Sequence, residues 1–282
     1  MPNPEAQTGL SHKLEKKRKR QADASSSKQD KPETSPAAPA AATDGSNKKK
    51  RKKAKKNNPQ SEQDVKQQDR KDGVDESIGK MDGPLLADYF AQRAKKLDKE
   101  LSAVELSDLS VPGSVFLDTT SFTSPRTLDQ LPAFIKKFSP KNADLSKASE
   151  EKGAPHTLVI SPAALRAADV VRALRSFQNK ESIVGKLFAK HIKLEEAKQF
   201  LQRARTGMGV GTPTRVSDLI ESGTLKLGEL ERIVIDGSHI DQKQRGIFDM
   251  KETHLPLLQL LTRSELRERY GASKKPVQIL MF

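Results

Sequence analysis

The sequence predicts an α/β protein, in which a single domain with a mostly parallel sheet follows a disordered basic N-terminal tail. From residue 81 onward, short apolar runs alternate with stretches of helical periodicity, which is the pattern of strands joined by helical crossovers. Two of these runs, residues 158–160 and 233–235, consist of aliphatic side chains alone, as buried parallel strands do. Residues 81–282 therefore form one domain that is long enough to bury a core.

Residues 1–80 differ from the domain in composition. They carry 20 Lys and Arg against 12 Asp and Glu, but only six large apolar side chains. Ordering a residue costs roughly 1–2 kcal/mol of backbone entropy, and six scattered side chains cannot bury enough surface to offset that cost. We therefore expect residues 1–80 to be disordered, with an extended Pro/Ala/Ser linker at 32–42.

Each element of the domain follows from local periodicity. Apolar residues at helical spacing predict a long helix over 85–103, and Pro162 suits the first turn of a later helix. Short apolar runs bounded by turn residues predict strands. The expected strands are 115–117, 158–160, 183–184, 208–211, 233–235 and 277–282, and the other expected helices are 128–138, 162–177, 194–201, 216–223, 254–261 and 264–270.

The overall composition excludes several classes of protein. The chain has 51 Lys and Arg against 37 Asp and Glu, a formal net charge of +14, and no cysteine. Without cysteine there is no disulfide scaffold, thiol nucleophile, zinc finger or iron–sulfur cluster. No apolar run reaches the roughly 18 residues of a membrane span, and the N-terminus lacks the apolar core of a secretory signal. The sequence predicts a soluble intracellular protein with a polyanionic partner, most simply nucleic acid.

Two uninterrupted or nearly uninterrupted basic runs lie in the tail, at 16–20 and 48–56. Such runs are typical of nuclear or nucleolar localisation signals, and they also neutralise phosphates by counterion release. No aromatic residue is interleaved, so RNA contact through the tail should be non-specific and salt-dependent. The alternative is a solvated charged tail with no specific partner. The predicted targeting residues are Lys16, Lys17, Arg18, Lys19, Arg20, Lys48, Lys49, Lys50, Arg51, Lys52 and Lys53.

In a parallel sheet, ligands bind beyond the carboxyl ends of the strands. The segments expected at that position are 118–126, 161–162, 185–186, 212–215 and 236–239. Four of these segments resemble, in order and spacing, landmarks of the first RecA-like domain of DEAD-box RNA helicases. The matching motifs are Ser161-Pro162 with Leu165-Arg166 for Pro-Thr-Arg-Glu-Leu, Gly185-Lys186 for the glycine motif, Thr212-Pro213-Thr214-Arg215 for Thr-Pro-Gly-Arg, and Asp236-Gly237-Ser238-His239 for Asp-Glu-Ala-Asp.

The departures from the helicase pattern argue against catalysis. A Gly-rich phosphate loop with Lys and Ser/Thr is missing, and the stretch in its expected place, 118–127, has neither glycine nor Lys. Asp236 is retained, but Gly237 stands where the water-activating Glu would be and His239 where the last Asp would be. We expect no ATP hydrolysis, no cofactor and no metal, and one RecA-like domain where a helicase has two. Asp236 has the alternative role of capping the turn after its strand.

The degenerate pattern and the basic tail resemble the Cms-type family of small-subunit pre-ribosome (processome) components. The resemblance runs from about residue 85 to 282 and rests on the segments 88–91, 153–158, 165–169 and 186–191. It implies a nucleolar ribosome-biogenesis role without catalysis, with pre-ribosomal proteins, small nucleolar RNA and pre-rRNA as partners. No membrane and no small-molecule substrate is expected.

The resemblance also nominates RNA contacts in the folded domain. Helix N-termini favour anions, and the Pro-started helices after Ser161 and Thr212 would present backbone N–H groups to RNA phosphates. The candidate RNA-binding residues are Arg166, Lys186, Thr212 and Arg215. The match is incomplete, because Ala163 and Ala164 replace contacting side chains and Thr214 replaces a glycine.

Rival interpretations rest on weaker signals. The G-x-G-x-G at 207–211 resembles the motif of S-adenosylmethionine methyltransferases, but it lies late in the domain. Ser238-His239 lacks the nucleophile elbow of a hydrolase, and the five histidines show no metal-ligand spacing. An active nucleotide-dependent enzyme and a general nuclear RNA-binding protein unrelated to ribosomes therefore stay as alternatives.

Overall fold

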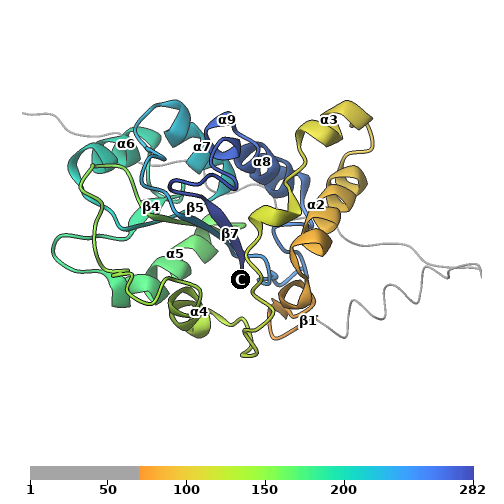
Figure 1. Ribbon diagram of the computed structural model, residues 1–282, viewed down its shortest axis with the longest axis horizontal. Helices are drawn as coiled ribbons and strands as arrows, with labels where there is room; N and C mark the ends of the chain where they lie inside the picture. The colour runs from red at the N-terminus through yellow and green to blue at the C-terminus, as the bar shows by residue number, and fades with distance from the viewer. Residues whose placement is uncertain (1–69) are drawn as a thin grey trace, which may run out of the picture. The chain divides into compact units, whose positions relative to one another are not determined.

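The computed structural model describes residues 70–282, and in them a five-stranded sheet forms the centre of an α/β domain. All neighbouring strands of this sheet are parallel, in the order β4-β5-β3-β6-β7 (Figure 1). This confirms the predicted fold class. The strands are β3 (Thr157–Ile160), β4 (Gly185–Leu187), β5 (Met208–Gly211), β6 (Arg232–Ile235) and β7 (Gln278–Met281).

Helices cover both faces of the sheet, because alternate strand residues point to opposite faces. Leu158 and Ile160 pack with α2, α6, α7, α8 and α9, whereas Val159 packs with α4, α5 and the 3₁₀ turn η4. In Figure 1, α4 and α5 lie below the sheet and α6, α7 and α8 above it. These helices are α2 (Gly83–Leu97), α4 (Leu131–Lys137), α5 (Ala164–Ala173), η4 (Leu174–Phe177), α6 (Leu194–Arg203), α7 (Pro213–Glu221), α8 (Lys251–Leu261) and α9 (Ser264–Arg267).

Three predicted elements differ in the structure. The helix expected over 85–103 ends at Leu97, and a separate α3 (Ala103–Asp108) begins where Ser102 and Glu105 form a capping box. The strand expected at 183–184 lies at β4 instead: Ile183 is 38% exposed, and although Val184 is buried, pairing with β5 starts only at Gly185. Residues 115–117 form no named strand.

The run at 115–117 contributes to the sheet in a different way. It follows the 3₁₀ turn η2 (Gly113–Val115), and Phe116 makes only an isolated parallel bridge to Ile279. The Leu117 amide donates to the Ile279 carbonyl at 2.8 Å, so this segment covers the free edge of β7. Residues 128–138 are helical as expected, although the first turn is the 3₁₀ turn η3 (Leu128–Gln130).

The described residues before 81, which the sequence predicted as part of the tail, pack onto the domain. Residues 70–80, here called the strap, form β1 (Arg70–Lys71), β2 (Val74–Asp75) and the 3₁₀ turn η1 (Ile78–Lys80). Val74 and Ile78 are buried, and β2 continues antiparallel onto the segment after β6 through a bridge between Val74 and His239. The prediction of disorder is wrong for the strap, because two apolar side chains suffice when the domain supplies the surface that covers them.

The rest of the predicted tail, residues 1–69, with both basic runs, lies outside the described residues. In the part of the chain that the structure does describe, none of the helices has the length and apolar character needed to cross a membrane.

Candidate functional site at the carboxyl ends of the strands

The retained acidic residue of the site is held by an arginine of the same chain. Asp236 follows β6 and is 1% exposed. The Arg166 guanidinium, in the first turn of α5, donates from Nε to Asp236 Oδ2 at 2.9 Å and from Nη2 to Oδ1 at 3.0 Å. This geometry is the bidentate fork that arginine makes with a carboxylate, and it neutralises the carboxylate internally. The structure thus joins two residues for which the sequence predicted separate roles.

The pairing changes what Arg166 can do. Its side chain is 14% exposed and the Nε/Nη2 edge of its guanidinium faces Asp236, so little of the side chain faces solvent. Releasing it toward RNA would leave Asp236 buried and unpaired, which is costly in a low-dielectric site. Arg166 is therefore poorly placed for the RNA contact that the sequence nominated.

Gly237 is packed so closely that a side chain at that position would require Met281 and Phe248 to shift. A Cβ on Gly237 would lie 2.5 Å from Met281 Cε and 3.0 Å from Phe248 Cε2. Its amide donates to the Phe282 carbonyl at 2.8 Å, which joins the segment to the end of β7. The glycine at this position therefore reflects dense packing between the ends of β6 and β7.

The last two residues of the acidic motif are covered by the strap. The Asp75 amide donates to the Ser238 carbonyl at 2.6 Å, and the Ile240 amide donates to the Gly73 carbonyl at 3.0 Å. Ser238 is fully buried, and His239 is partly buried. Burial lowers the pKa of His239 below its ordinary value, and the nearby Arg166 charge lowers it further.

The stretch expected in place of a phosphate loop contains a buried arginine instead. Arg126 is 4% exposed and donates to the carbonyls of Met281, Thr119 (3.0 Å) and Gly79 (3.1 Å). It thereby joins the end of β7, its own loop and the strap. Burial lowers the pKa of Arg126 to about 10. A Cβ on Gly79 would lie 2.5 Å from Arg126 Nε, so only glycine lets the strap approach this closely.

A cavity of about 420 Å³ lies beside Arg126, between the strap and the loop 119–126. Hydroxyl groups and two basic residues line it, together with a single carboxylate. The lining residues are Glu76, Gly79, Lys80, Thr120, Phe122, Thr123, Ser124, Pro125 and Arg126.

The other predicted RNA-contacting residues lie on the β4–β5 side of the sheet. Lys186 is exposed on β4, and Thr212 precedes α7 without a side-chain cap to the helix N-terminus. Arg215 Nη1 donates to the Ile192 carbonyl at 3.1 Å and so holds the loop after β4 against α7. That loop also presents Lys190 and Lys193 to solvent. We call Lys186, Lys190 and Lys193 the basic edge.

The sequence gives no indication of the buried Arg126, the ordered strap or the pairing of Arg166 with Asp236. The segment 118–126 was selected as a place to look, but only for the glycines and lysine that it lacks. An isolated arginine after a proline carries no local signal of burial. Its partners are carbonyls from residues 79, 119 and 281, which only the fold brings together.

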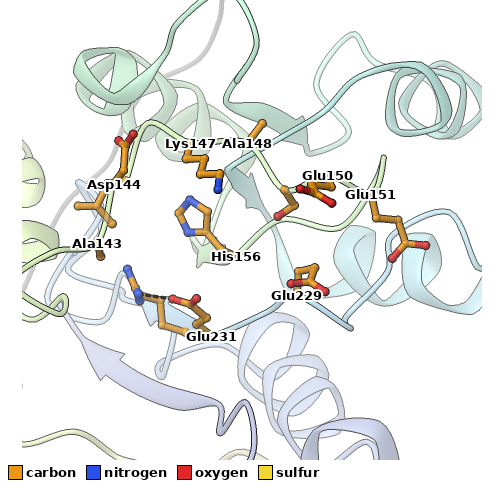
Figure 2. Close-up of a pocket in the computed structure, with 12 residues that line it drawn as sticks. Ala143, Asp144, Lys147, Ala148, Glu150, Glu151, His156, Glu229 and Glu231 are labelled. Carbon is orange, nitrogen blue, oxygen red and sulfur yellow. Dashed lines mark hydrogen bonds and ion pairs between the residues drawn. The ribbon is translucent and has the colours of Figure 1, made fainter.

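A second groove, of about 520 Å³, lies at the opposite edge of the sheet, near the amino ends of β3 and β6. Figure 2 shows His156 within this groove, with Glu150, Glu151 and Glu229 around it. Burial lowers the pKa of His156, and the Arg232 charge adds to that effect. Its carboxylates outnumber its cations, although Glu151, Glu229 and Glu231 are paired with Lys226, Lys275 and Arg232.

The fold and the site first define the class of protein: a RecA-like α/β domain. The end of its sheet where the strands reach their carboxyl termini, here called the carboxyl edge, is lined by the chain's own arginines and the strap. The sequence then identifies the family. Residues 11–282 match the model of CMS1, described as a U3-containing 90S pre-ribosomal complex subunit, and the chain belongs to this family. The predicted family resemblance is confirmed, and with it a place among ribosome-biogenesis proteins.

Relatives from distant organisms agree with this assignment. Protein CMS1 of Chaetomium thermophilum is 50% identical over 210 residues, which is 74% of this chain and 84% of that protein. Protein cms1 of Schizosaccharomyces pombe is 32% identical over 192 residues, 68% of each chain. Human protein CMSS1 is 32% identical over 191 residues, 68% of this chain and 62% of the human protein.

Proposed function

We propose that this chain is a non-catalytic docking module of the small-subunit pre-ribosome. The observation that carries the proposal is that the chain's own residues bind one another at the carboxyl ends of the strands: Arg166 pairs with Asp236, and Arg126 is buried in the stretch that lacks a phosphate loop. Gly237 supplies no side chain that could act as a general base, and it is closely packed against Met281 and Phe248. A site filled in this way can present a surface to partners without binding and hydrolysing a nucleotide.

The basic edge is the proposed RNA contact of the domain. Lys186, Lys190 and Lys193 are exposed, and none of them forms an ion pair with any residue of 70–282. The N-terminus of α7 lies next to them, since Arg215 joins this helix to their loop, and helix N-termini attract phosphate. The groove at the amino edge supports the same orientation, because its carboxylates outnumber its cations.

The partners that we propose are pre-ribosomal proteins, pre-rRNA and a small nucleolar RNA, in the nucleolus. The family description names a U3-containing pre-ribosomal complex, which supports this choice. The basic runs at 16–20 and 48–56 are the proposed targeting signals. Affinity purification of the full chain should recover processome proteins with their guide RNA, and recovery of unrelated nuclear RNAs in their place would favour a general RNA-binding protein.

The RNA contact is tested by charge reversal in the full chain. We expect Lys186→Glu, Lys190→Glu and Lys193→Glu together to lower affinity for a structured RNA and to reduce the slope of log affinity against log salt by about 2–3, because each lost phosphate contact removes about one unit. The matched control is Glu150→Lys with Glu151→Lys, which changes the charge of the opposite edge. An unchanged slope in the basic-edge variant, measured by filter binding across salt concentrations, would remove RNA from the proposal.

The absence of catalysis is tested by calorimetry. We expect no heat of binding for ATP with magnesium or for S-adenosylmethionine at micromolar concentrations. Saturable micromolar binding accompanied by turnover would replace the docking module with an enzyme.

A further inference from the structure

The described residues contain four Ser/Thr-Pro dipeptides, and their hydroxyl groups differ in exposure and in hydrogen bonding. Ser161 is fully buried, and Thr212 is a partly buried N-terminal residue of α7. Ser139 Oγ is occupied, since it donates to the Ile135 carbonyl at 2.6 Å and accepts from Arg232 Nη1 at 2.9 Å. Ser124 is exposed, as is Pro125, and its hydroxyl bonds to no residue of 70–282.

Ser124 also lies on the cavity beside Arg126, which places a free hydroxyl next to a buried cation. All hydrogen bonds of the Arg126 guanidinium go to uncharged oxygens of residues 79, 119 and 281, and no carboxylate within 70–282 pairs with it. Neutral oxygens and the Phe134 ring, 5.3 Å from Arg126 Cζ, therefore offset the cost of burying this charge, and no counter-anion contributes. The single carboxylate of the cavity lining, Glu76, is exposed to solvent.

The remaining lining chemistry suits a phosphate monoester. Thr123 supplies a hydroxyl group and Lys80, in the strap, supplies a second positive charge, whereas the Thr120 hydroxyl donates to Asp118 Oδ1 at 2.7 Å. The space of about 420 Å³ exceeds what one phosphate group needs. A phosphate on Ser124 would be two residues from Arg126 and would have both the strap and its own loop within reach.

We propose that Ser124 is a phosphorylation site for a proline-directed protein kinase and that its phosphate occupies the cavity as the counter-anion of Arg126. In this reaction the γ-phosphoryl group of ATP passes to Ser124 Oγ. The new P–O bond forms as the bond to the β-phosphate oxygen breaks, ADP leaves, and the hydroxyl proton passes to the base of the kinase. The phosphate then bridges the loop 119–126 and the strap through Arg126 and Lys80.

The site is independent of the proposed docking function, because it depends on local charge alone. Its consequence is a tighter attachment of the strap, since the phosphate would connect the strap to the loop. The modification therefore alters the carboxyl edge without touching the basic edge.

The experiment uses the full chain, phosphorylated in vitro by a proline-directed kinase and mapped by mass spectrometry. We expect incorporation at Ser124, absent from Ser124→Ala and unaffected by Ser139→Ala. Phosphorus NMR then measures the pKa for the second ionisation of the phosphate. We expect this pKa to lie at least about 0.5 unit below its value of about 6 in the urea-unfolded protein, because nearby cations favour the dianion.

Two variants separate the site from general folding effects. Arg126→Gln should return the phosphate pKa toward its value in the unfolded protein. Lys80→Ala replaces an exposed residue, so it should leave the circular dichroism unchanged and reverse part of the shift in the phosphate pKa. No incorporation at Ser124, or a phosphate pKa equal to that of the unfolded chain, would overturn the proposal. Tight binding of free inorganic phosphate to unmodified protein would also overturn it, since the cavity would then be filled without a covalent source.

Discussion

Two arginines decide the chemistry of the carboxyl edge at the scale of single residues. Arg166 pairs with Asp236 through two charge-assisted hydrogen bonds, and Arg126 donates to three carbonyls from separate parts of the chain. In both cases the cation is largely buried and bonded within the domain. In a ligand-binding site such charges would instead be accessible to the ligand. The same positions that would serve a nucleotide in the resembled helicases here serve the fold.

The Arg166–Asp236 pair gives a prediction about stability. Removing one partner leaves a buried charge unpaired, so Arg166→Met should lower the free energy of unfolding by about 3–5 kcal/mol. The variant Arg166→Met/Asp236→Leu should recover much of this loss, because no unpaired charge remains. Urea unfolding monitored by circular dichroism measures both. A loss below about 1 kcal/mol in the single variant would mean that Arg166 is not committed to Asp236.

The strap is the element that closes the carboxyl edge. An ion pair attaches it to the domain: Arg70 contacts Asp249 at 3.0 Å. Arg70 also contacts Asp75 within the strap at 2.8 Å, and Arg93 of α2 contacts the other oxygen of Asp249 at 3.0 Å. Apolar burial adds to them, since Ile78 joins the core cluster that contains α2 and α8. The strap therefore belongs to the domain even though its composition resembles the tail.

Substitution within the strap tests this assignment in the full chain. Ile78 is 1% exposed, so Ile78→Ala should cost about 2–5 kcal/mol of unfolding free energy, as other buried large-to-small changes do. The matched control is Val104→Ala, because Val104 is 70% exposed and its loss should stay within about 0.5 kcal/mol. Equal thermal stability of the two variants would return residues 70–80 to the tail.

At the scale of the whole molecule, the buried histidines predict how stability depends on pH. Burial lowers the pKa of His254 to about 4, and its ring lies 2.9 Å from the Phe90 carbonyl inside an aromatic cluster. Burial also lowers the pKa values of His156 and His239. Since the unfolded chain then binds more protons than the folded one, stability is retained at neutral pH and lost as pH falls from about 6.5 to about 4.

The size of this effect is set mainly by His254. A depression from 6.5 to about 4 corresponds to about 3 kcal/mol, because one pKa unit is about 1.4 kcal/mol. Unfolding free energies measured at intervals between pH 7 and pH 4 should decline by that order, and His254→Gln should flatten the decline. A curve that is level down to pH 5 would show that these histidines are not buried in the folded state.

The sequence alone determined the fold class and most of the strands, because buried parallel strands are short aliphatic runs and amphipathic helices repeat at 3.6 residues. The apolar runs at 158–160, 208–211 and 233–235 lie within or match strands β3, β5 and β6. The end of the helix at Leu97 and the exact position of β4 were harder to predict. A capping box and the burial of individual side chains determine them, and periodicity does not.

The family, too, was within reach of the sequence, because ordered motifs survive in it even where their chemistry has changed. What only the tertiary structure decided is how the site is filled. Arg166 pairs with a carboxylate 70 residues away, and Arg126 donates to a carbonyl 155 residues away. Such partners are set by the packing of β3, β6 and β7 with the strap, and no local pattern in the chain encodes a contact that arises when distant strand ends meet.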